Sequence, residues 1–143
     1  MNEERLAIIG LGYVGLPLAL AFARRFRHVV GFDIDRDRTE ALRQGYDRTR
    51  EVDREDLLMS GLRVTADPSE LADATCFIVT VPTPIDQDRR PDLGALRKAC
   101  ADIGAVIRPG AVVVFESTVY PGVTEEICGG EIARTSGLRR GVD

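Results

Sequence analysis

Short apolar runs rich in β-branched residues alternate with longer helical patterns along almost the whole chain. Within each run apolar residues are nearly continuous, which is typical of strands covered on both faces. Repeated β-α-β units of this kind fold as a parallel sheet between helices, so we expect one α/β domain without internal repeats or linkers. The expected strands are 5–10, 28–32, 62–65, 75–81 and 111–115, and the expected helices are 14–26, 36–44, a brief one opened by Asp67, 92–107 and 124–134.

Two stretches lack a clear period. Residues 47–63 are polar and highly charged, with 56–60 as one possible helical turn. Residues 82–91 contain three prolines and follow the carboxyl end of a predicted strand. Open α/β sheets bind their ligands at that end, so the second stretch is predicted to be a binding loop.

Composition excludes several classes of partner. Of the 143 residues, 44% are hydrophobic, which is enough to form a core. The formal net charge is −4, and such an acidic chain does not offer the basic face that nucleic acid requires. No apolar run approaches the roughly 18 residues that cross a bilayer. The first residues are acidic and their apolar run is short, unlike a signal peptide. We therefore expect a cytoplasmic domain with neither a nucleic-acid nor a membrane partner.

The cysteines and the histidine give no sign of a metal or disulfide framework. Cys76, Cys100 and Cys128 lack CxxC spacing and are odd in number, so they are predicted to be reduced packing residues. His28, the only histidine, begins a predicted strand without a nucleophile or ligand near it in sequence, and we interpret it as structural. No metal site is expected.

The sequence Gly10-Leu11-Gly12-Tyr13-Val14-Gly15, called the phosphate turn below, has the G-x-G-x-x-G spacing between a strand and a helix. In such a turn the first glycine permits a tight bend and the second lets the backbone approach a pyrophosphate. The third lets the helix pack closely on the strand. Amides at the helix N-terminus then hold the anion.

An acidic residue follows at the spacing that a dinucleotide site requires. Asp33 ends the second strand 18 residues after Gly15, close to the expected 20 or so. A carboxylate there accepts the ribose hydroxyls and repels a 2′-phosphate, which favours NAD over NADP. Arg36 and Arg38 lie just beyond it, where either residue is able to accommodate a 2′-phosphate; the alternative is that both are solvated at a helix start, with Arg38 over the adenine face.

Four motifs together resemble the UDP-glucose/GDP-mannose dehydrogenase family, and within it the bacterial enzymes that oxidise UDP-N-acetylhexosamines. They are GLGYVGLPLA at 10–19, GFDID at 31–35, VTVPTPID followed by PDL within 79–93, and ESTVYPGVTEE at 116–126. The resemblance covers essentially the whole chain in register. It implies a Rossmann-type doubly wound parallel sheet of order 3-2-1-4-5, with a sixth strand expected after residue 143.

The resemblance also implies an activity and a set of site residues. Enzymes of this family oxidise C6 of a nucleotide sugar twice with NAD, through a thiohemiacetal and a thioester on a cysteine. A threonine near the nicotinamide also helps to hold a catalytic water, and the matching residue here is Thr118. The residues that match cofactor-binding positions are Gly10, Gly12, Tyr13, Val14, Gly15, Asp33, Arg38 (beside the adenosine), Val81, Pro82, Thr83, Ser117 and Thr118.

The family's catalytic cysteine, lysine, asparagine and aspartate have no match within residues 1–143. We therefore expect 1–143 to be the NAD-binding domain of a nucleotide-sugar 6-dehydrogenase that does not turn over alone and that self-associates as a homo-oligomer. The alternatives are a UDP-glucose 6-dehydrogenase and a non-catalytic NAD-binding module. Another dehydrogenase of the same fold would account for the phosphate turn but not for VPTPID or ESTVYPG. Glu116 is open to two interpretations, a strand-end carboxylate satisfied by backbone amides or a cofactor contact.

Overall fold

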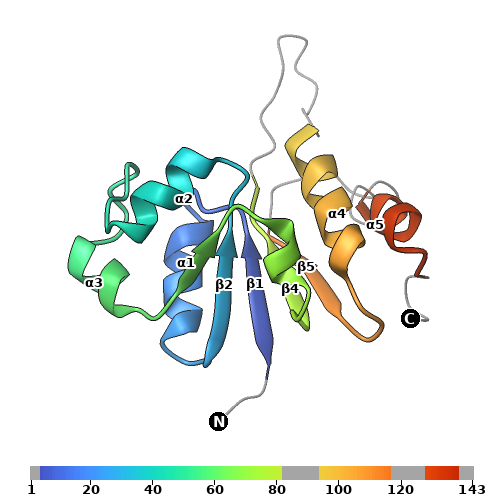
Figure 1. The fold of residues 1–143 in the computed structure, drawn as a ribbon, viewed down its shortest axis with the longest axis horizontal. Helices are drawn as coiled ribbons and strands as arrows, with labels where there is room; N and C mark the ends of the chain where they lie inside the picture. The colour runs from blue at the N-terminus through green and yellow to red at the C-terminus, as the bar shows by residue number, and fades with distance from the viewer. Residues whose placement is uncertain (1–3, 82–93, 117–127, 139–143) are drawn as a thin grey trace.

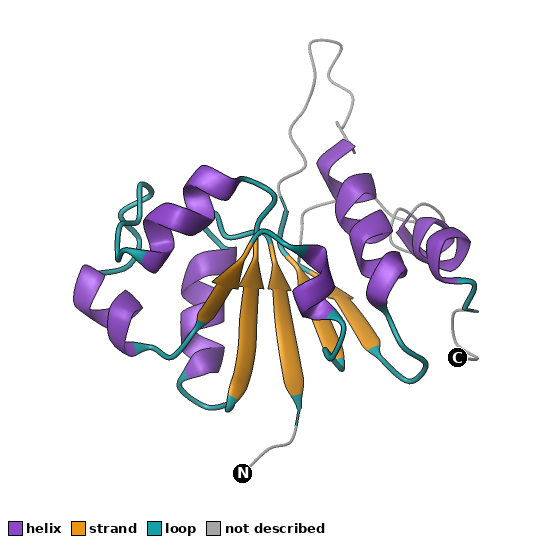
Figure 2. Ribbon diagram, viewed as in Figure 1, coloured by secondary structure: helices purple, strands orange, loops and turns teal. Residues whose placement is uncertain are grey.

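The fold is built on a parallel β-sheet in the computed structural model, which describes residues 4–81, 94–116 and 128–138. The described strands form one five-stranded sheet of order β3-β2-β1-β4-β5, and every neighbouring pair is parallel. Figure 2 shows all the arrowheads at one end of the sheet. The predicted fold class is thus confirmed. The strands are β1 (Arg5–Ile9), β2 (His28–Phe32), β3 (Arg63–Thr65), β4 (Cys76–Val79) and β5 (Val112–Phe115).

Helices cover both faces of the sheet (Figure 1). One face packs against α1, α2 and α3, and the other packs against the 3₁₀ turn η1 and α4, on which α5 rests as an outer layer. The helical elements are α1 (Gly15–Ala23), α2 (Arg36–Arg43), α3 (Arg54–Met59), η1 (Pro68–Leu71), α4 (Gly94–Val106) and α5 (Gly129–Ser136).

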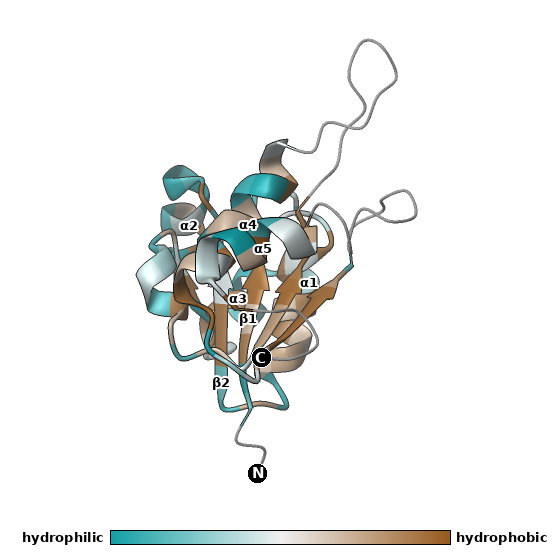
Figure 3. Cartoon of the chain, turned by 90° about the vertical axis from the view of Figure 1, so that its right-hand side faces the viewer, coloured by the Kyte–Doolittle hydropathy of each residue, from teal (hydrophilic) through white to brown (hydrophobic). Residues whose placement is uncertain are grey.

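Alternation along β1 divides the core into two clusters. Leu6 and Ile8 point to the α1 side, whereas Ala7 and Ile9 point to the α4 side, and all four side chains are buried. This period of two is what a strand imposes on successive side chains. Figure 3 shows the strands as the most hydrophobic layer, enclosed by more polar helices.

Three predicted helices differ from the structure at their ends. The first ends at Ala23 rather than at residue 26, because Phe26 N–H bonds back to the Phe22 carbonyl in a closing turn. The possible turn at 56–60 is a true helix, α3, whose Leu57 side chain is buried. The last helix ends at Ser136, two residues later than predicted, and is followed by Gly137 in the left-handed conformation. Its predicted start at residue 124, and the predicted N-cap Asp92, lie outside the described residues.

In the described part of the chain, no helix combines the length and the apolar character needed to span a bilayer.

The contact between α4 and α5 depends on a residue without a side chain. A Cβ added at Gly104 of α4 would lie 1.6 Å from Thr135 Oγ1 and 3.0 Å from the Ile132 carbonyl oxygen of α5. We expect Gly104→Ala to push the helices apart and lower the free energy of unfolding by about 1–3 kcal/mol. Urea denaturation followed by circular dichroism measures this.

Gly130 is the matched control, because it is also helical and an added Cβ there meets nothing within 4 Å. Gly130→Ala is expected to leave stability unchanged or raise it by up to about 1 kcal/mol through helix propensity. Equal losses in both variants would show that helix packing is not the cause.

Candidate functional site

The phosphate turn has the geometry that its glycines require. Gly10 has φ +98°, in the region that side chains disfavour, and its N–H donates to the Phe32 carbonyl at 2.8 Å. A Cβ on Gly15 would lie 1.7 Å from the Gly10 carbonyl oxygen, so α1 packs against the turn only because residue 15 is glycine. The structure thus confirms two of the three predicted glycine roles: Gly10 permits the tight bend, and Gly15 permits the close packing of α1 on the turn. Both roles arise from contacts within the protein and involve no ligand.

Gly12 has no such internal explanation. A Cβ built there meets nothing within 4 Å, so the open space lies on the outside of the turn. The following residues, Tyr13 and Val14, are 69% and 60% exposed, and Val14 caps α1 without any side-chain hydrogen bond. The exposed residues Gly12, Tyr13 and Val14 thus lie at the positive end of the α1 dipole, as an anion site requires.

Leu11 holds the turn in place by three separate contacts. Its N–H donates to Asp33 Oδ2 at 3.0 Å. Its carbonyl oxygen accepts from Nε and one terminal nitrogen of Arg38, at 2.9 and 2.6 Å. Its side chain is fully buried against Gly31 of β2, where an added Cβ would lie 2.8 Å from the leucine methyl.

Asp33 lies at the carboxyl end of β2, beside the turn. Besides the Leu11 amide, its carboxylate accepts the Asp35 N–H through Oδ1 at 3.0 Å. Each oxygen has a second lone pair, and the side chain is half-buried beside a hollow of about 290 Å³. The hollow is lined by Ile9, Gly10, Leu11, Gly12, Phe32, Asp33, Ile34, Arg48, Val81, Ala95, Lys98 and Ala99.

Two basic residues of this hollow, Arg48 and Lys98, were not predicted from the sequence. Arg48 pairs with Asp35 at 3.3 Å, and Lys98 pairs with Asp102, one helical turn further along α4, at 2.9 Å. For Lys98 a signal existed: Ala95, Lys98 and Ala99 share one helical face at i, i+3 and i+4 spacing. The residue lies at the amino-terminal end of α4, near the carboxyl ends of the strands.

Arg38 is buried, with 2% of its surface exposed, so the interpretation of this residue as solvated is wrong. Its guanidinium is fixed between the Leu11 carbonyl and Asp47, whose Oδ1 lies 2.8 Å from the terminal nitrogen. Asp47 also accepts the N–H groups of Thr49, Glu51 and Val52 and the hydroxyl of Thr49. The loop after α2 is thereby joined to the phosphate turn through one arginine.

The same hydrogen bonds set the charge of Asp47. Burial alone would raise the pKa of this carboxyl, but donors from Thr49, Arg38 and the Val52 amide outweigh it and lower the pKa to about 2. The carboxylate is therefore charged throughout the physiological range.

The remaining predicted site residues divide into those that the structure places and those that it does not. Val81 lines the hollow, next to Thr80, whose hydroxyl donates to the Gly10 carbonyl at 2.7 Å and was not predicted. Glu116 follows β5 with an exposed side chain, and its N–H donates to the Val79 carbonyl at 2.9 Å. The predicted residues Pro82, Thr83, Ser117 and Thr118 lie outside the described part of the chain.

The cysteines are packing residues, as predicted. Cys100 and Cys128 are buried together in the core on the α4 side, and burial raises the pKa of both thiols. Cys76 is half-buried in β4, and burial raises the pKa of its thiol as well. Such thiols are protonated and poorly reactive. Among the described residues, no group of three or more His, Cys, Asp or Glu side chains is arranged to hold a metal ion.

The fold and the phosphate turn, with an acidic residue after β2 and a hollow at the carboxyl ends of the strands, define a dinucleotide-binding domain. Residues 4–143 match the profile of the UDP-glucose/GDP-mannose dehydrogenase family, NAD binding domain, and the chain belongs to that family. The cofactor of the domain is therefore NAD.

Relatives within the family include several enzymes of amino-sugar nucleotides. The chain is 51% identical over 140 residues to UDP-N-acetyl-D-glucosamine 6-dehydrogenase of Pseudomonas aeruginosa, covering 97% of this chain and 33% of that protein. The structure of UDP-D-ManNAc dehydrogenase from Pyrococcus horikoshii superposes with a TM-score of 0.88 at 38% identity, covering 97% of this chain and 34% of that one. GDP-mannose dehydrogenase of Pseudomonas aeruginosa gives the same TM-score, 0.88, at 32% identity over 97% and 34% of the two chains. The chain thus spans about a third of the length of these relatives.

The lowered pKa of Asp47 predicts a pH-dependent contribution to stability. Because the pKa of Asp47 in the folded protein is about 2 and the ordinary pKa of an aspartate is 3.8, the contribution is present above about pH 4 and is lost as the pH falls toward 2. It amounts to about 2 kcal/mol. Asp47→Asn should abolish this acid-dependent loss, and at pH 7 it should lower the free energy of unfolding by about 3 kcal/mol by leaving Arg38 without its counter-charge. Denaturant unfolding at pH 7, 4 and 3 measures both effects.

Asp53→Asn is the control, because Asp53 is an exposed carboxyl that makes no capping hydrogen bond. It should follow the wild-type pH dependence. If Asp47→Asn also loses the same stability between pH 5 and 3 as the wild type, Asp47 is not the group responsible.

Proposed function

We propose that this chain supplies the NAD-binding domain of a nucleotide-sugar 6-dehydrogenase that oxidises a UDP-N-acetylhexosamine to the uronic acid. The observation that carries the proposal is the phosphate turn held beside Asp33 within a domain of this family. The choice of sugar is supported by the relatives at 51% and 45% identity, both named UDP-N-acetyl-D-glucosamine 6-dehydrogenase.

The described residues divide the work of holding the dinucleotide. The exposed turn Gly12-Tyr13-Val14, at the positive end of α1, receives the pyrophosphate on the open side of Gly12. The free lone pairs of Asp33 accept the adenosine ribose hydroxyls and repel a 2′-phosphate. Bound NAD supplies the hydride acceptor for each of the two oxidations.

Arg38 acts in this proposal mainly as a positioning residue. Its guanidinium fork holds the Leu11 carbonyl, so it fixes the turn on which the adenosine half of NAD rests. Val81 contributes apolar surface to the hollow. Pro82 and Thr83 are assigned to the adenosine ribose from their match to the family motif. Ser117 and Thr118 serve the nicotinamide end, where Thr118 holds the catalytic water.

The rest of the enzyme is assigned to segments outside this domain, which spans about a third of its relatives. Those segments supply the sugar pocket and the catalytic cysteine, so residues 1–143 bind NAD but do not turn over alone. The enzyme acts in the cytoplasm on precursors of surface polysaccharides. It works as a homo-oligomer. Residues 1–143 on their own are expected to self-associate as well, because β5, with Val112 56% exposed, lies at an edge of the described sheet.

A substrate panel distinguishes this proposal from its alternatives. A full-length protein that contains this domain is expected to reduce two NAD per sugar with UDP-GlcNAc, UDP-GalNAc or UDP-ManNAc. Absorbance at the NADH band, with mass spectrometry of the uronate, measures this. Oxidation of UDP-glucose or GDP-mannose alone would overturn the amino-sugar assignment. NAD binding without oxidation of any sugar would favour a non-catalytic module.

Cofactor choice is tested on the chain itself. Asp33→Asn retains one acceptor oxygen for the Leu11 amide but loses the charge and the bond from the Asp35 amide, so we expect NAD affinity to fall about 10- to 100-fold. NADP affinity should rise, because the repulsion of a 2′-phosphate is relieved. Calorimetric titration with each dinucleotide measures the change.

Asp37→Asn removes the same charge from an exposed position in the first turn of α2 and should leave both affinities within about twofold of the wild type. If the wild-type chain prefers NADP, or if both variants behave alike, Asp33 does not select the cofactor.

A further inference from the structure

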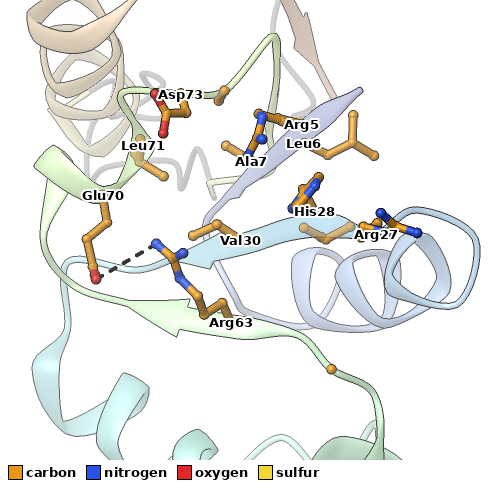
Figure 4. A pocket seen from close by; sticks show the side chains of 13 residues that line it. Arg5, Leu6, Ala7, Arg27, His28, Val30, Arg63, Glu70, Leu71 and Asp73 are labelled. Atoms are coloured by element: carbon orange, nitrogen blue, oxygen red, sulfur yellow. Dashed lines mark ion pairs between the residues drawn. The ribbon is translucent and has the colours of Figure 1, made fainter. Parts of the chain in front are cut away.

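A second hollow lies at the opposite end of the sheet from the phosphate turn (Figure 4). It has a volume of about 130 Å³ and is formed where β1, β2 and β3 begin. β1 runs from Arg5 at this hollow to Ile9 beside the turn, a span of about 13 Å at the rise of a strand. The two hollows are therefore separate. This one is lined by Arg5, Leu6, Ala7, Arg27, His28, Val29, Val30, Gly61, Arg63, Glu70, Leu71, Asp73 and Ala74.

Strand register brings three basic side chains to one face. Arg5 of β1 is paired with His28 of β2, and Arg63 of β3 is paired with Val30, two residues after His28. Since side chains two apart share a face, Arg5, His28 and Arg63 all lie on the side of the sheet that carries η1. Figure 4 shows them around the hollow, with Ala7 and Val30 between them.

The hollow is open because the connection that crosses this face is short. Between β3 and β4 the chain makes only the four-residue turn η1, about 8 Å long at the rise of a 3₁₀ helix. Leu71 of η1 is buried over the middle of the sheet, and Glu70 of η1 lies 3.9 Å from Arg63, at the start of the edge strand β3. The amino end of this face is left as a notch with an apolar floor.

The acidic residues at the hollow are already engaged. Glu70 bonds to the Thr65 hydroxyl and lies 3.9 Å from Arg63. Asp73 pairs with Arg108 at 3.3 Å. Within the part of the chain that the structure describes, the guanidinium groups of Arg5 and Arg27 form no ion pair.

The charge balance at the hollow therefore differs from that of the whole chain. Three arginines face two carboxylates there, and His28 adds a further donor, whereas the chain as a whole carries −4. Arginine presents fixed pairs of donors that match the oxygens of a phosphate group. A local positive site on an acidic protein also attracts small anions selectively over polyanions such as nucleic acid, which the remaining surface repels.

We infer that this notch is a second anion site, which takes the phosphate group of a small metabolite between Arg5, Arg63 and His28, with Arg27 at its rim. It is independent of the dinucleotide site, since no residue lines both hollows. The guanidinium of Arg63 turns from its long contact with Glu70 to the bound oxyanion, and Arg5 donates from the neighbouring strand.

The test is a ¹H–¹⁵N NMR titration of the 15.7 kDa chain with sodium pyrophosphate at low ionic strength and with saturating NAD present. NAD occupies the phosphate turn, so the probe reports on the other site. We expect saturable shifts at the amides of 5–7, 27–30 and 61–63. Sodium chloride at matched ionic strength separates specific binding from general screening. Shifts confined to 10–15, or equal shifts with chloride, would overturn the proposal.

Two variants sharpen the result. The double variant Arg5→Gln/Arg63→Gln should raise the dissociation constant for pyrophosphate at least tenfold and leave NAD affinity within twofold. Arg54→Gln removes charge from an exposed residue of α3 away from the notch and should change neither value. If the double variant does not give a folded spectrum, Arg27→Gln replaces it in the test, because Arg27 lies outside the strands. This variant is expected to weaken pyrophosphate binding about threefold or more. Unchanged binding in folded variants would also overturn the proposal.

Discussion

The fixed position of the Leu11 carbonyl is the constraint on which the cofactor end of this domain depends. A buried arginine, Arg38, donates two hydrogen bonds to that oxygen, and its charge is balanced by Asp47. Neither ion is exposed, so each needs the other: an unpaired charge at this depth costs several kcal/mol. The turn is therefore held in place before any ligand arrives, with Gly12, Tyr13 and Val14 already exposed at the positive end of α1.

Hydrophobic patterning was sufficient to predict the sheet. The second strand was predicted at its observed bounds, His28–Phe32, because a short β-branched run without alternation, between two helical patterns, is typical of a strand covered on both faces. The spacing Gly10 to Gly15 likewise predicted the turn, since its backbone demands are local. Helix ends were less accurate: α1 stops at Ala23, whereas the prediction extended it to Phe26, whose ring contacts that of Phe22 edge to face across the closing turn.

Hydrophobic patterns and local motifs did not predict hydrogen bonds between side chains and groups distant in the sequence. Arg38 was predicted to lie beside the adenosine, with solvation at a helix start as one interpretation, and nothing local shows that Asp47, nine residues later, accepts its charge within the core. Thr80 is another case, because a hydroxyl at a strand end has no periodicity that marks it as a partner of Gly10. These contacts join segments that meet only after the sheet has formed, so their chemistry follows from the fold and not from any motif.

The contact between Leu11 and Gly31 has a consequence for anyone who wishes to move this nucleotide turn into another protein. The leucine fills the space that a side chain on β2 would occupy, and its carbonyl needs an arginine from α2. A graft of the contiguous six-residue segment would bring the ligand-facing amides but not their supports. The smallest portable unit is discontinuous: the segment itself, a glycine on the adjacent strand, and the Arg38–Asp47 pair, with the helix and loop that present it.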